Sequence, residues 1–268
     1  MATVGVMDLQ LTGTRAIIVG GTKGIGRGVA EALAREGAVV TVAARHDVDA
    51  IAAEIAAQTG GAVHGVVIDS RDDGSVQAGV AAAAAVMGGV DILVNTAAAP
   101  WNASKNTVAS QTGDDAMREE FEEKVLGYLR AARAVAPLMT AQGWGRIINV
   151  SGLGARKSGS VAQTVRNISV AAITKNLADE LGPHGVNVTV VHPGTTLTDA
   201  VEERVAARVA AGETRADAER ALAGNIIGRI VTVAELADVI AFLASPRSVA
   251  ITGGAVDAGG GTPGVVTY

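Results

Sequence analysis

Cysteine is absent from this chain of 268 residues, and aromatic residues make up only 2% of it. Without cysteine, disulfide bonds and thiolate metal sites are excluded, and nothing indicates an oxidising compartment. The four histidines also lack the spacing of metal ligands, so no metal site is expected. Because aromatic side chains are so few, the hydrophobic share of 49% predicts a core built mainly of alanine, valine, isoleucine and leucine.

Long apolar runs and positive charge are scarce as well. The first residues, MATVGVMDLQLTG, lack the basic start and apolar stretch of a signal peptide, and no apolar run reaches membrane-spanning length. The net charge is −5, and no basic stripe typical of nucleic-acid binding is visible. We therefore expect a cytoplasmic protein whose partner is a small-molecule substrate, with neither nucleic acid nor membrane as a partner.

What the sequence contains is a regular alternation of short apolar runs and segments of helical period. Strands are expected at residues 15–20, 38–44, 62–68, 91–94, 146–150, 186–191 and 255–257. Helices are expected at residues 25–36, 48–58, 72–87, 114–141, 163–181 and 233–243. The strands are apolar throughout, which is typical of burial on both faces. The pattern predicts an α/β fold, a doubly wound parallel sheet (Rossmann fold) of about seven strands with helices on both faces.

The alternation continues without a linker, a repeat or a low-complexity tail, so one domain is expected over residues 1–268. Two further helical stretches, at residues 198–211 and 216–222, follow the sixth strand as an insertion. We expect this insertion, at about residues 195–230, to cover the substrate together with the loop residue Trp101.

A glycine-rich segment, GGTKGIG at residues 20–26, lies directly between the first strand and the first helix. A turn without side chains approaches a pyrophosphate closely, and free N–H groups at the positive end of the helix bind its charge. Such glycines also occur in plain tight turns, but their place in the opening βαβ unit favours a dinucleotide site. The segment therefore predicts that the protein binds NAD(H) or NADP(H).

The spacing of these glycines resembles that of the short-chain dehydrogenase/reductase family. Five further segments, in the family's order, are similar to its motifs: DILVNTAA at 91–98, GRIINVS at 145–151, PG at 193–194 with Thr198, ITG at 251–253 and DAGG at 257–260. The first of these departs from the family at Thr96 and Ala98, where the family has asparagine and glycine. The resemblance covers nearly the whole chain, and it implies an oxidoreductase that forms a homotetramer or a homodimer.

The resemblance also implies where the cofactor is held. The residues expected along the pyrophosphate are Gly20, Gly21, Gly24, Ile25 and Gly26. The residues expected at the adenine and the ribose are Asp69, Asn95 and Ala97. The residues expected to hold the nicotinamide carboxamide are Pro193, Gly194 and Thr198.

The end of the second strand distinguishes NAD from NADP. An acidic residue there binds both ribose hydroxyls and repels a 2′-phosphate, but this chain has Ala44 followed by Arg45, with Lys23 in the glycine loop. These two cations suit an additional phosphate, although both residue types are also common as solvated surface charges. NADP(H) is the expected preference, with NAD(H) as the alternative.

The catalytic positions depart from the family, which uses a serine after the fifth strand, a tyrosine acid, a lysine four residues later, and an asparagine on the preceding helix. Alignment with the family's helices places Gln163 at the tyrosine and Asn167 at the lysine. Gly152 falls on the serine, with Ser151 as its neighbour, and Lys124 falls on the asparagine. Lysine and asparagine have therefore exchanged helices.

Hydride transfer to a carbonyl leaves an alkoxide that needs a proton. We expect Lys124 to point into the pocket as the acid or base, since burial and a positive nicotinamide both lower the pKa of an ammonium. Asn167 and Ser151 are its expected polar partners. The alternative is an exposed lysine in the charged segment REEFEEK. Tyr128 is expected in the core, and His192 is a lesser candidate for the acid.

Three functions fit these residues. The preferred one is a short-chain NADP(H)-dependent oxidoreductase with an atypical active site, which acts on a small carbonyl or alcohol substrate. The second is a nucleotide-bound enzyme without net redox change, such as an isomerase or lyase that uses Lys124 as its base. The third is a catalytically inactive regulatory protein that binds the cofactor. An intact cofactor site favours the first two and the missing tyrosine favours the last two, so the fold alone does not separate them.

Overall fold

The computed structural model describes residues 7–98 and 108–266, so Trp101 lies outside the described residues. Its main feature is a seven-stranded sheet in the order β3-β2-β1-β4-β5-β6-β9, in which every pairing is parallel. The strands are β1 (Arg15–Val19), β2 (Val39–Ala44), β3 (Val63–Val67), β4 (Ile92–Asn95), β5 (Gly145–Val150), β6 (Val186–Pro193) and β9 (Ala255–Ala258). The predicted doubly wound sheet is confirmed.

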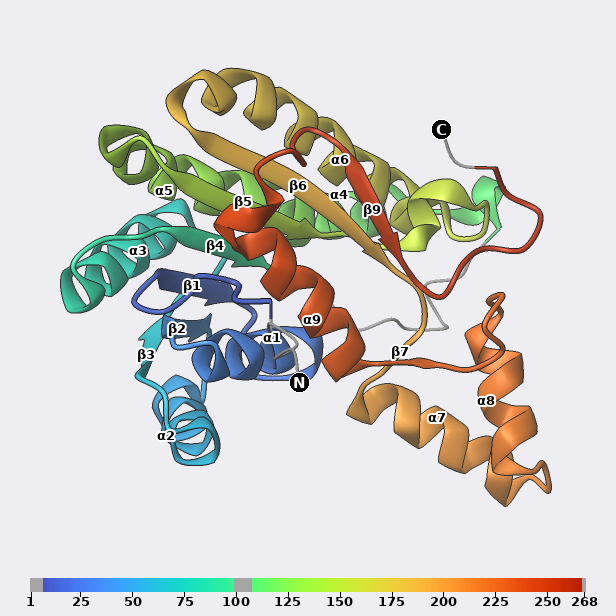
Figure 1. Cartoon of the computed structure of the whole chain (residues 1–268). Coiled ribbons are helices and arrows are strands. Elements are labelled where there is room, and N and C mark those ends of the chain that lie inside the picture. Colours follow the sequence, from blue (N-terminus) through green and yellow to red (C-terminus); the bar gives the residue numbers. More distant parts are fainter. Residues whose placement is uncertain (1–6, 99–107, 267–268) are drawn as a thin grey trace.

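Helices cover both faces of the sheet (Figure 1). One face carries α1 (Gly24–Arg35), α2 (Val48–Thr59) and α9 (Val233–Ala244). The other face carries α3 (Asp73–Met87), α4 (Asp114–Glu120), α5 (Gly127–Gln142) and α6 (Val161–Leu181). The shorter helical turns are η2 (Ala109–Gln111), η3 (Phe121–Leu126), η4 (Leu153–Arg156), η5 (Gly182–His184) and η6 (Pro246–Ser248).

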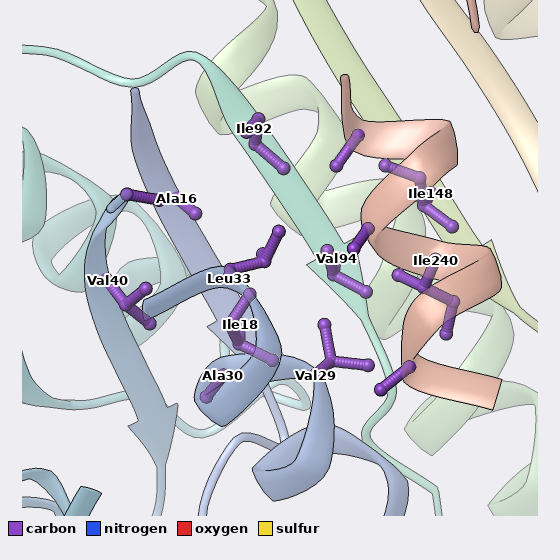
Figure 2. Packing of buried hydrophobic residues seen from close by; sticks show 14 of the residues in the cluster. Ala16, Ile18, Val29, Ala30, Leu33, Val40, Ile92, Val94, Ile148 and Ile240 are labelled. Atoms are coloured by element: carbon purple, nitrogen blue, oxygen red, sulfur yellow. The ribbon is translucent and has the colours of Figure 1, made fainter. Parts of the chain in front are cut away.

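An aliphatic core fills the space on each side of the sheet. Figure 2 shows Ile18, Val94 and Ile148 of three adjacent strands packed against Val29 of α1 and Ile240 of α9, all of them buried. Burial of an aliphatic side chain of this size contributes about 1.5–3 kcal/mol. Successive side chains of a strand point to opposite faces, so the neighbouring positions of these apolar strands fill the core against α3, α5 and α6.

The two outer strands correct the prediction that all strands are buried on both faces. Val67 of β3 is 60% exposed, and β9 alternates between exposed and half-buried residues. Each of these strands has a neighbour on one side only. Their apolar residues therefore lie partly in solvent at the edges of the sheet.

The segment after β6 forms a small unit of its own. It contains β7 (Thr196–Leu197), α7 (Asp199–Ala210), α8 (Arg215–Ala223) and β8 (Val231–Thr232), and β7 pairs with β8. The helices α7 and α8 project beside the carboxyl ends of the strands (Figure 1). Val205, Ala218 and Ile230 make a separate apolar cluster between them. This segment therefore borders the space at the carboxyl ends of the strands.

The helix predicted over residues 114–141 is interrupted, which corrects that prediction. The α-helix α4 ends at Glu120, a π-helical turn covers Phe121–Leu126, and α5 begins at Gly127. Pro137, by contrast, lies inside α5 without ending it. A π turn is recognised by its wider hydrogen bonds and is frequent at functional sites, and this one carries Lys124.

None of the helices formed by the described residues combines the length and the apolar composition needed to cross a bilayer.

Candidate functional site

Three adjoining cavities lie along the carboxyl ends of the strands, with volumes of about 120, 500 and 510 Å³. The first two share the residues Gly20, Lys23, Ala97 and Ala98. The second and third share the residues Ile25, Thr198, Val201 and Arg204. The three cavities therefore form one groove at the edge where doubly wound sheets bind dinucleotides.

The glycine loop shapes the middle of this groove. Gly20 has a φ of +86°, and a Cβ there would lie 2.7 Å from the backbone nitrogen of Ala97, so no other residue fits. Lys23 precedes α1 without a side-chain cap, which leaves the first N–H groups of that helix without intrahelical partners. Gly24, Ile25 and Gly26, at this helix start, line the 500 Å³ cavity. Glycine backbone at the start of a helix is the arrangement that binds phosphate groups in other proteins.

Gly21 has a different place from the other loop glycines. Its N–H donates to the carbonyl oxygen of Ile18 at 3.1 Å, and that of Gly20 donates to Ala43 at 2.7 Å. A Cβ on Gly21 would lie 2.8 Å from the Ile18 oxygen. Gly21 does not line the cavities, so its part is to form the turn.

The 120 Å³ cavity lies at the ends of β2 and β3. It is lined by Lys23, Arg45 and Asp69, as expected for the adenosine end, and also by Arg71 and Glu123. Burial alone raises the pKa of Asp69, but hydrogen bonds from Arg71 outweigh it and the pKa is lowered. Arg71, which was not among the residues predicted from the sequence, lies two residues after Asp69 and pairs with its carboxylate at 3.4 Å.

Asn95 lies beneath the groove and not in its wall. It is fully buried, and its Nδ2 donates to Oδ1 of Asn149 at 2.9 Å. Asn149 in turn donates to Oγ1 of Thr174 at 3.0 Å. Oδ1 of Asn95 has no partner in the part of the chain that the structure describes. Asn95 thus links β4 and β5 to α6, and Ala97 forms the wall above it.

The opposite end of the groove contains the motif expected at the nicotinamide. Pro193, Gly194 and Thr198 line the 510 Å³ cavity. Thr198 precedes α7 and lies close to Gly24 of α1, since a Cβ built there would lie 3.4 Å from its methyl group. This contact brings the start of α7 to the start of α1. The start of the segment expected as a cover therefore forms part of the groove wall.

Lys124, Ser151 and Asn167 meet in space, although they lie on three different elements. Nζ of Lys124 donates to the carbonyl oxygen of Ser151 at 2.9 Å and to Oδ1 of Asn167 at 3.2 Å. The Ser151 hydroxyl donates to the Asn167 carbonyl oxygen at 3.1 Å. Lys124 is only 3% exposed, so the alternative of a solvated surface lysine is wrong.

The depth of Lys124 corrects the expectation that its amine points into the pocket. Ser151 and Asn167 line the 510 Å³ cavity, but Lys124 does not. Nζ lies one hydrogen bond behind that wall. A side chain on Gly154 would approach Nδ2 of Asn167 to 3.0 Å, so the amide nitrogen lies beside the glycine-rich wall while its oxygen faces the amine.

The surroundings of Lys124 lower its proton affinity. Burial lowers the pKa of Lys124 to about 7, the charge of Arg166 acts in the same direction, and Glu120 opposes both. Nζ also lies 5.8 Å from the centre of the Tyr128 ring. The Tyr128 hydroxyl donates to the Val150 carbonyl oxygen at 2.9 Å, and burial raises its pKa. Tyr128 therefore lies in the core, as expected. The amine of Lys124, with a pKa of about 7, gains or loses its proton near neutral pH.

A buried ion pair joins the helices that carry these residues. Arg166 donates from Nη1 to Oε2 of Glu120, and both side chains are buried. Glu120 lies one turn before Lys124, and Arg166 lies directly before Asn167. This pair was not among the residues predicted from the sequence; the local signal for it was an arginine on the face of α6 that also presents Gln163 and Asn167.

Comparison with known proteins decides the family. The family model described as Enoyl-(Acyl carrier protein) reductase matches residues 19–262. The chain belongs to the short-chain dehydrogenase/reductase family. As in the solved structures it resembles, its sheet is parallel and has helices on both faces. L-sorbose reductase from Gluconobacter frateurii, complexed with NADPH and L-sorbose, has a TM-score of 0.88 and 27% identity, and the match covers 97% of this chain and 100% of that one.

Two named relatives cover nearly the whole chain. Short-chain reductase protein NovJ of Streptomyces niveus is 35% identical over 250 residues, which cover 92% of this chain and 93% of the relative. The 3-oxoacyl-[acyl-carrier-protein] reductase FabG of Escherichia coli (strain K12) is 30% identical over 255 residues, which cover 94% of this chain and 98% of the relative. These relatives are oxidoreductases, and this short-chain dehydrogenase/reductase belongs among them.

Four further polar residues, at the start of α6 and on β6, differ in their surroundings in this short-chain dehydrogenase/reductase. Gln163, expected where the family has tyrosine, lines the 510 Å³ cavity. Ser160 caps α6 by accepting from the Gln163 N–H, and the Thr164 hydroxyl donates to the Lys157 carbonyl oxygen at 3.1 Å. His192 is buried, and burial lowers its pKa. Over residues 7–98 and 108–266, no group of three or more histidine or acidic side chains is arranged to hold a metal ion.

Proposed function

We propose that this protein is an NADP(H)-dependent oxidoreductase that interconverts a small carbonyl compound and its alcohol. The observation that carries the proposal is the continuous groove from the cations beside β2 to Asn167 on α6. Its glycine loop supplies free N–H groups at one end of α1, and its far end contains Pro193, Gly194 and Thr198. The NADPH complex of the similar L-sorbose reductase supports the same assignment.

The residues of the groove fit the cofactor. A side chain at Gly20 would collide with Ala97, so the loop keeps open the space that a pyrophosphate needs. Lys23 and Arg45 line the 120 Å³ cavity and suit the charge of a 2′-phosphate. The nicotinamide ring, when bound, supplies the hydride.

The active-site residues act on the substrate oxygen. Oδ1 of Asn167 accepts from Lys124, which turns the amide nitrogen toward Gly152 and Gly154 in the cavity wall. From there Nδ2 donates a hydrogen bond to the substrate oxygen. The ammonium behind it stabilises the negative charge that develops on that oxygen. Lys124 then delivers its proton when the Asn167 side chain swings aside, and Ser151 holds Asn167 before and after this step.

Direct binding measurements with NADPH and NADH test the cofactor assignment. We expect a dissociation constant for NADPH of about 10 μM or tighter, and weaker binding of NADH. Arg45→Gln should weaken NADPH binding about tenfold, the effect of one charge-assisted hydrogen bond, and leave NADH unchanged. Arg35→Gln, a change on the exposed end of α1, is the matched control. Failure of both reduced cofactors to bind would refute the proposal.

A second candidate is a cofactor-bound enzyme without net redox change, with Lys124 as its base. Gln163 favours it, because this residue lines the cavity where the family places its tyrosine acid. A solved structure titled ribose-5-phosphate isomerase from Brucella melitensis 16M is 32% identical and has a TM-score of 0.80. Turnover of a substrate without any change in the absorbance of bound NADPH would favour this candidate over the first.

A further inference from the structure

We propose that the substrate is an anion, whose carboxylate or phosphate group is held by Arg166 and Lys157 where α6 begins. This inference rests on the proposed function, because it names the substrate class of the same site. It concerns the part of the 510 Å³ cavity beyond the nicotinamide motif.

The first observation is the sign of the charges around the cavity. The described residues that line it include Lys157, Arg166 and Arg204, but neither aspartate nor glutamate. The other two cavities each contain acids, as Glu123 does in one and Glu203 in the other. The chain as a whole carries a net charge of −5. A wall with cations alone, in an acidic protein, concentrates anions at this place.

The second observation is a buried guanidinium in the cavity wall with one donor that lacks a partner among the described residues. The Arg166 side chain is 10% exposed and pairs with Glu120, yet its Nε has no hydrogen-bond partner among the described residues. A buried donor without a partner is costly. The planar guanidinium offers several N–H groups and binds carboxylate or phosphate in a two-point fashion. Arg166 also forms part of the cavity wall, so its guanidinium charge lies beside any group that the cavity holds.

The third observation is the start of α6 itself. This helix has 21 residues and no acidic residue in its first turn, so its positive end is not neutralised by its own side chains. Lys157 lies just before it, and its carbonyl oxygen is tied to Thr164 in the first turn. Lys157 also lines the cavity, so its charge and the start of α6 lie on the same side of it.

The positions of Arg166 and Asn167 limit the substrate further. Both line the same cavity, so we expect the charged group and the reacting oxygen to belong to one small substrate. An oxo acid or a phosphorylated ketone of small size fits this arrangement. In the reduction, the carbonyl carbon receives the hydride of the reduced nicotinamide cofactor and the oxygen receives a proton. A hydroxy acid or a phosphorylated alcohol and the oxidised cofactor are the products.

Calorimetry on the NADP⁺-loaded protein tests this inference with matched pairs of ligands. The probes are acetoacetate against methyl acetoacetate, and dihydroxyacetone phosphate against dihydroxyacetone. We expect at least one acid to bind about tenfold more tightly than its neutral partner, the effect of one additional ion-paired hydrogen bond. The pair that shows the difference identifies whether carboxylate or phosphate is preferred. Equal affinities within both pairs, or no binding of either acid, would overturn the inference.

Variants separate this inference from the proposed function. Lys157→Gln should weaken binding of the acid severalfold and leave NADP⁺ binding unchanged, whereas Lys175→Gln, an exposed lysine farther along α6, should change neither. Arg166→Lys keeps the pairing with Glu120 but removes the planar fork, so acid binding should fall while the melting temperature stays close to that of the wild type. If the wild-type protein does not bind NADP⁺, the proposed function is refuted. If it binds NADP⁺ but shows no preference for acids, this inference alone is refuted.

Discussion

Lys124 is a charged side chain in the interior that keeps two oxygen acceptors. Its amine bonds to Ser151 and Asn167, so the cost of burying it is only partly offset, and burial lowers its pKa to about 7. An amine with a proton affinity near neutrality exchanges protons at physiological pH, which an ordinary lysine does not. At the scale of single residues, this is the group on which the proposed chemistry depends.

The pH dependence of turnover follows from this pKa. The proton donor is present below about 7 and is lost as the pH rises through that value, so the rate of carbonyl reduction should fall there. The rate of alcohol oxidation, which needs the neutral amine, should rise over the same range. Steady-state kcat measured in both directions, on both sides of neutrality, tests the signs of these two changes.

The variant Lys124→Met tests whether the ionisation belongs to this residue. It should lower kcat by about 100-fold, within the range for general acids, and remove the inflection near neutrality. Lys175→Met, at an exposed site on α6, is the matched control and should leave the profile intact. A profile that is unchanged in Lys124→Met would exclude the amine as the proton donor.

Two helices are held in register by one buried contact. Glu120 ends α4, just before the π turn that carries Lys124, and Arg166 lies on α6 directly before Asn167. The pair between them fixes the distance between amine and amide across the two elements. It also determines the local charge, since Arg166 lowers the pKa of Lys124 and Glu120 raises it.

Replacing Glu120 by glutamine should therefore have two separate effects. The buried Arg166 loses its counter-charge, which should lower the free energy of unfolding by about 3–5 kcal/mol, as for other broken buried pairs. Lys124 loses the neighbour that raises its pKa, so the fall in reduction rate should shift to lower pH. Chemical denaturation and the pH profile of kcat measure the two effects.

An exposed ion pair provides the comparison for Glu120→Gln. Glu202 of α7 pairs with Arg215 at 2.7 Å, and both side chains are accessible to solvent. Glu202→Gln should leave stability almost unchanged, because an exposed pair is screened by solvent, and should leave the pH profile in place. If both variants behave alike, the buried pair does not position Lys124.

Several apolar side chains are partly exposed on the outer surfaces of the helices beside the site. Leu126, Leu138 and Ile168 are 36%, 37% and 49% exposed, and they lie on the π turn, α5 and α6. Such side chains favour association when they gather on one surface. With the resemblance to the family, they support the prediction of a homodimer or homotetramer built through the long helices.

Sedimentation equilibrium of the full chain tests the oligomeric state. The expected mass is two or four times the 26.8 kDa of one chain. Ile168→Glu places a charge at the expected contact and should lower the mass to that of smaller species, because a buried unpaired charge is costly. Val67→Glu, at the exposed outer strand β3, is the control and should leave it unchanged. A monomeric wild type would contradict the prediction.

Local sequence information was sufficient to predict most of the fold and the phosphate-binding turn. Continuous aliphatic runs predict buried parallel strands, and glycines between strand and helix predict a phosphate-binding turn, since both patterns follow from the chemistry of neighbouring residues. The resemblance to the family selected Lys124, Ser151 and Asn167, and the structure brings these three together. Lys23, Arg45 and Asp69 likewise line one cavity.

Only the tertiary structure decided the depth and the electrostatics of the site. The π turn, the position of the Lys124 amine behind Asn167, and the pairing of Glu120 with Arg166 all depend on contacts between α4 and α6. The two paired residues are 46 positions apart in the chain, whereas hydrophobic periodicity reports on neighbours within a few turns. The sequence by itself therefore determined the order of the strands and most helices and the position of the phosphate-binding turn, and the packing of the elements determined how deeply the amine is buried and which charges act on it.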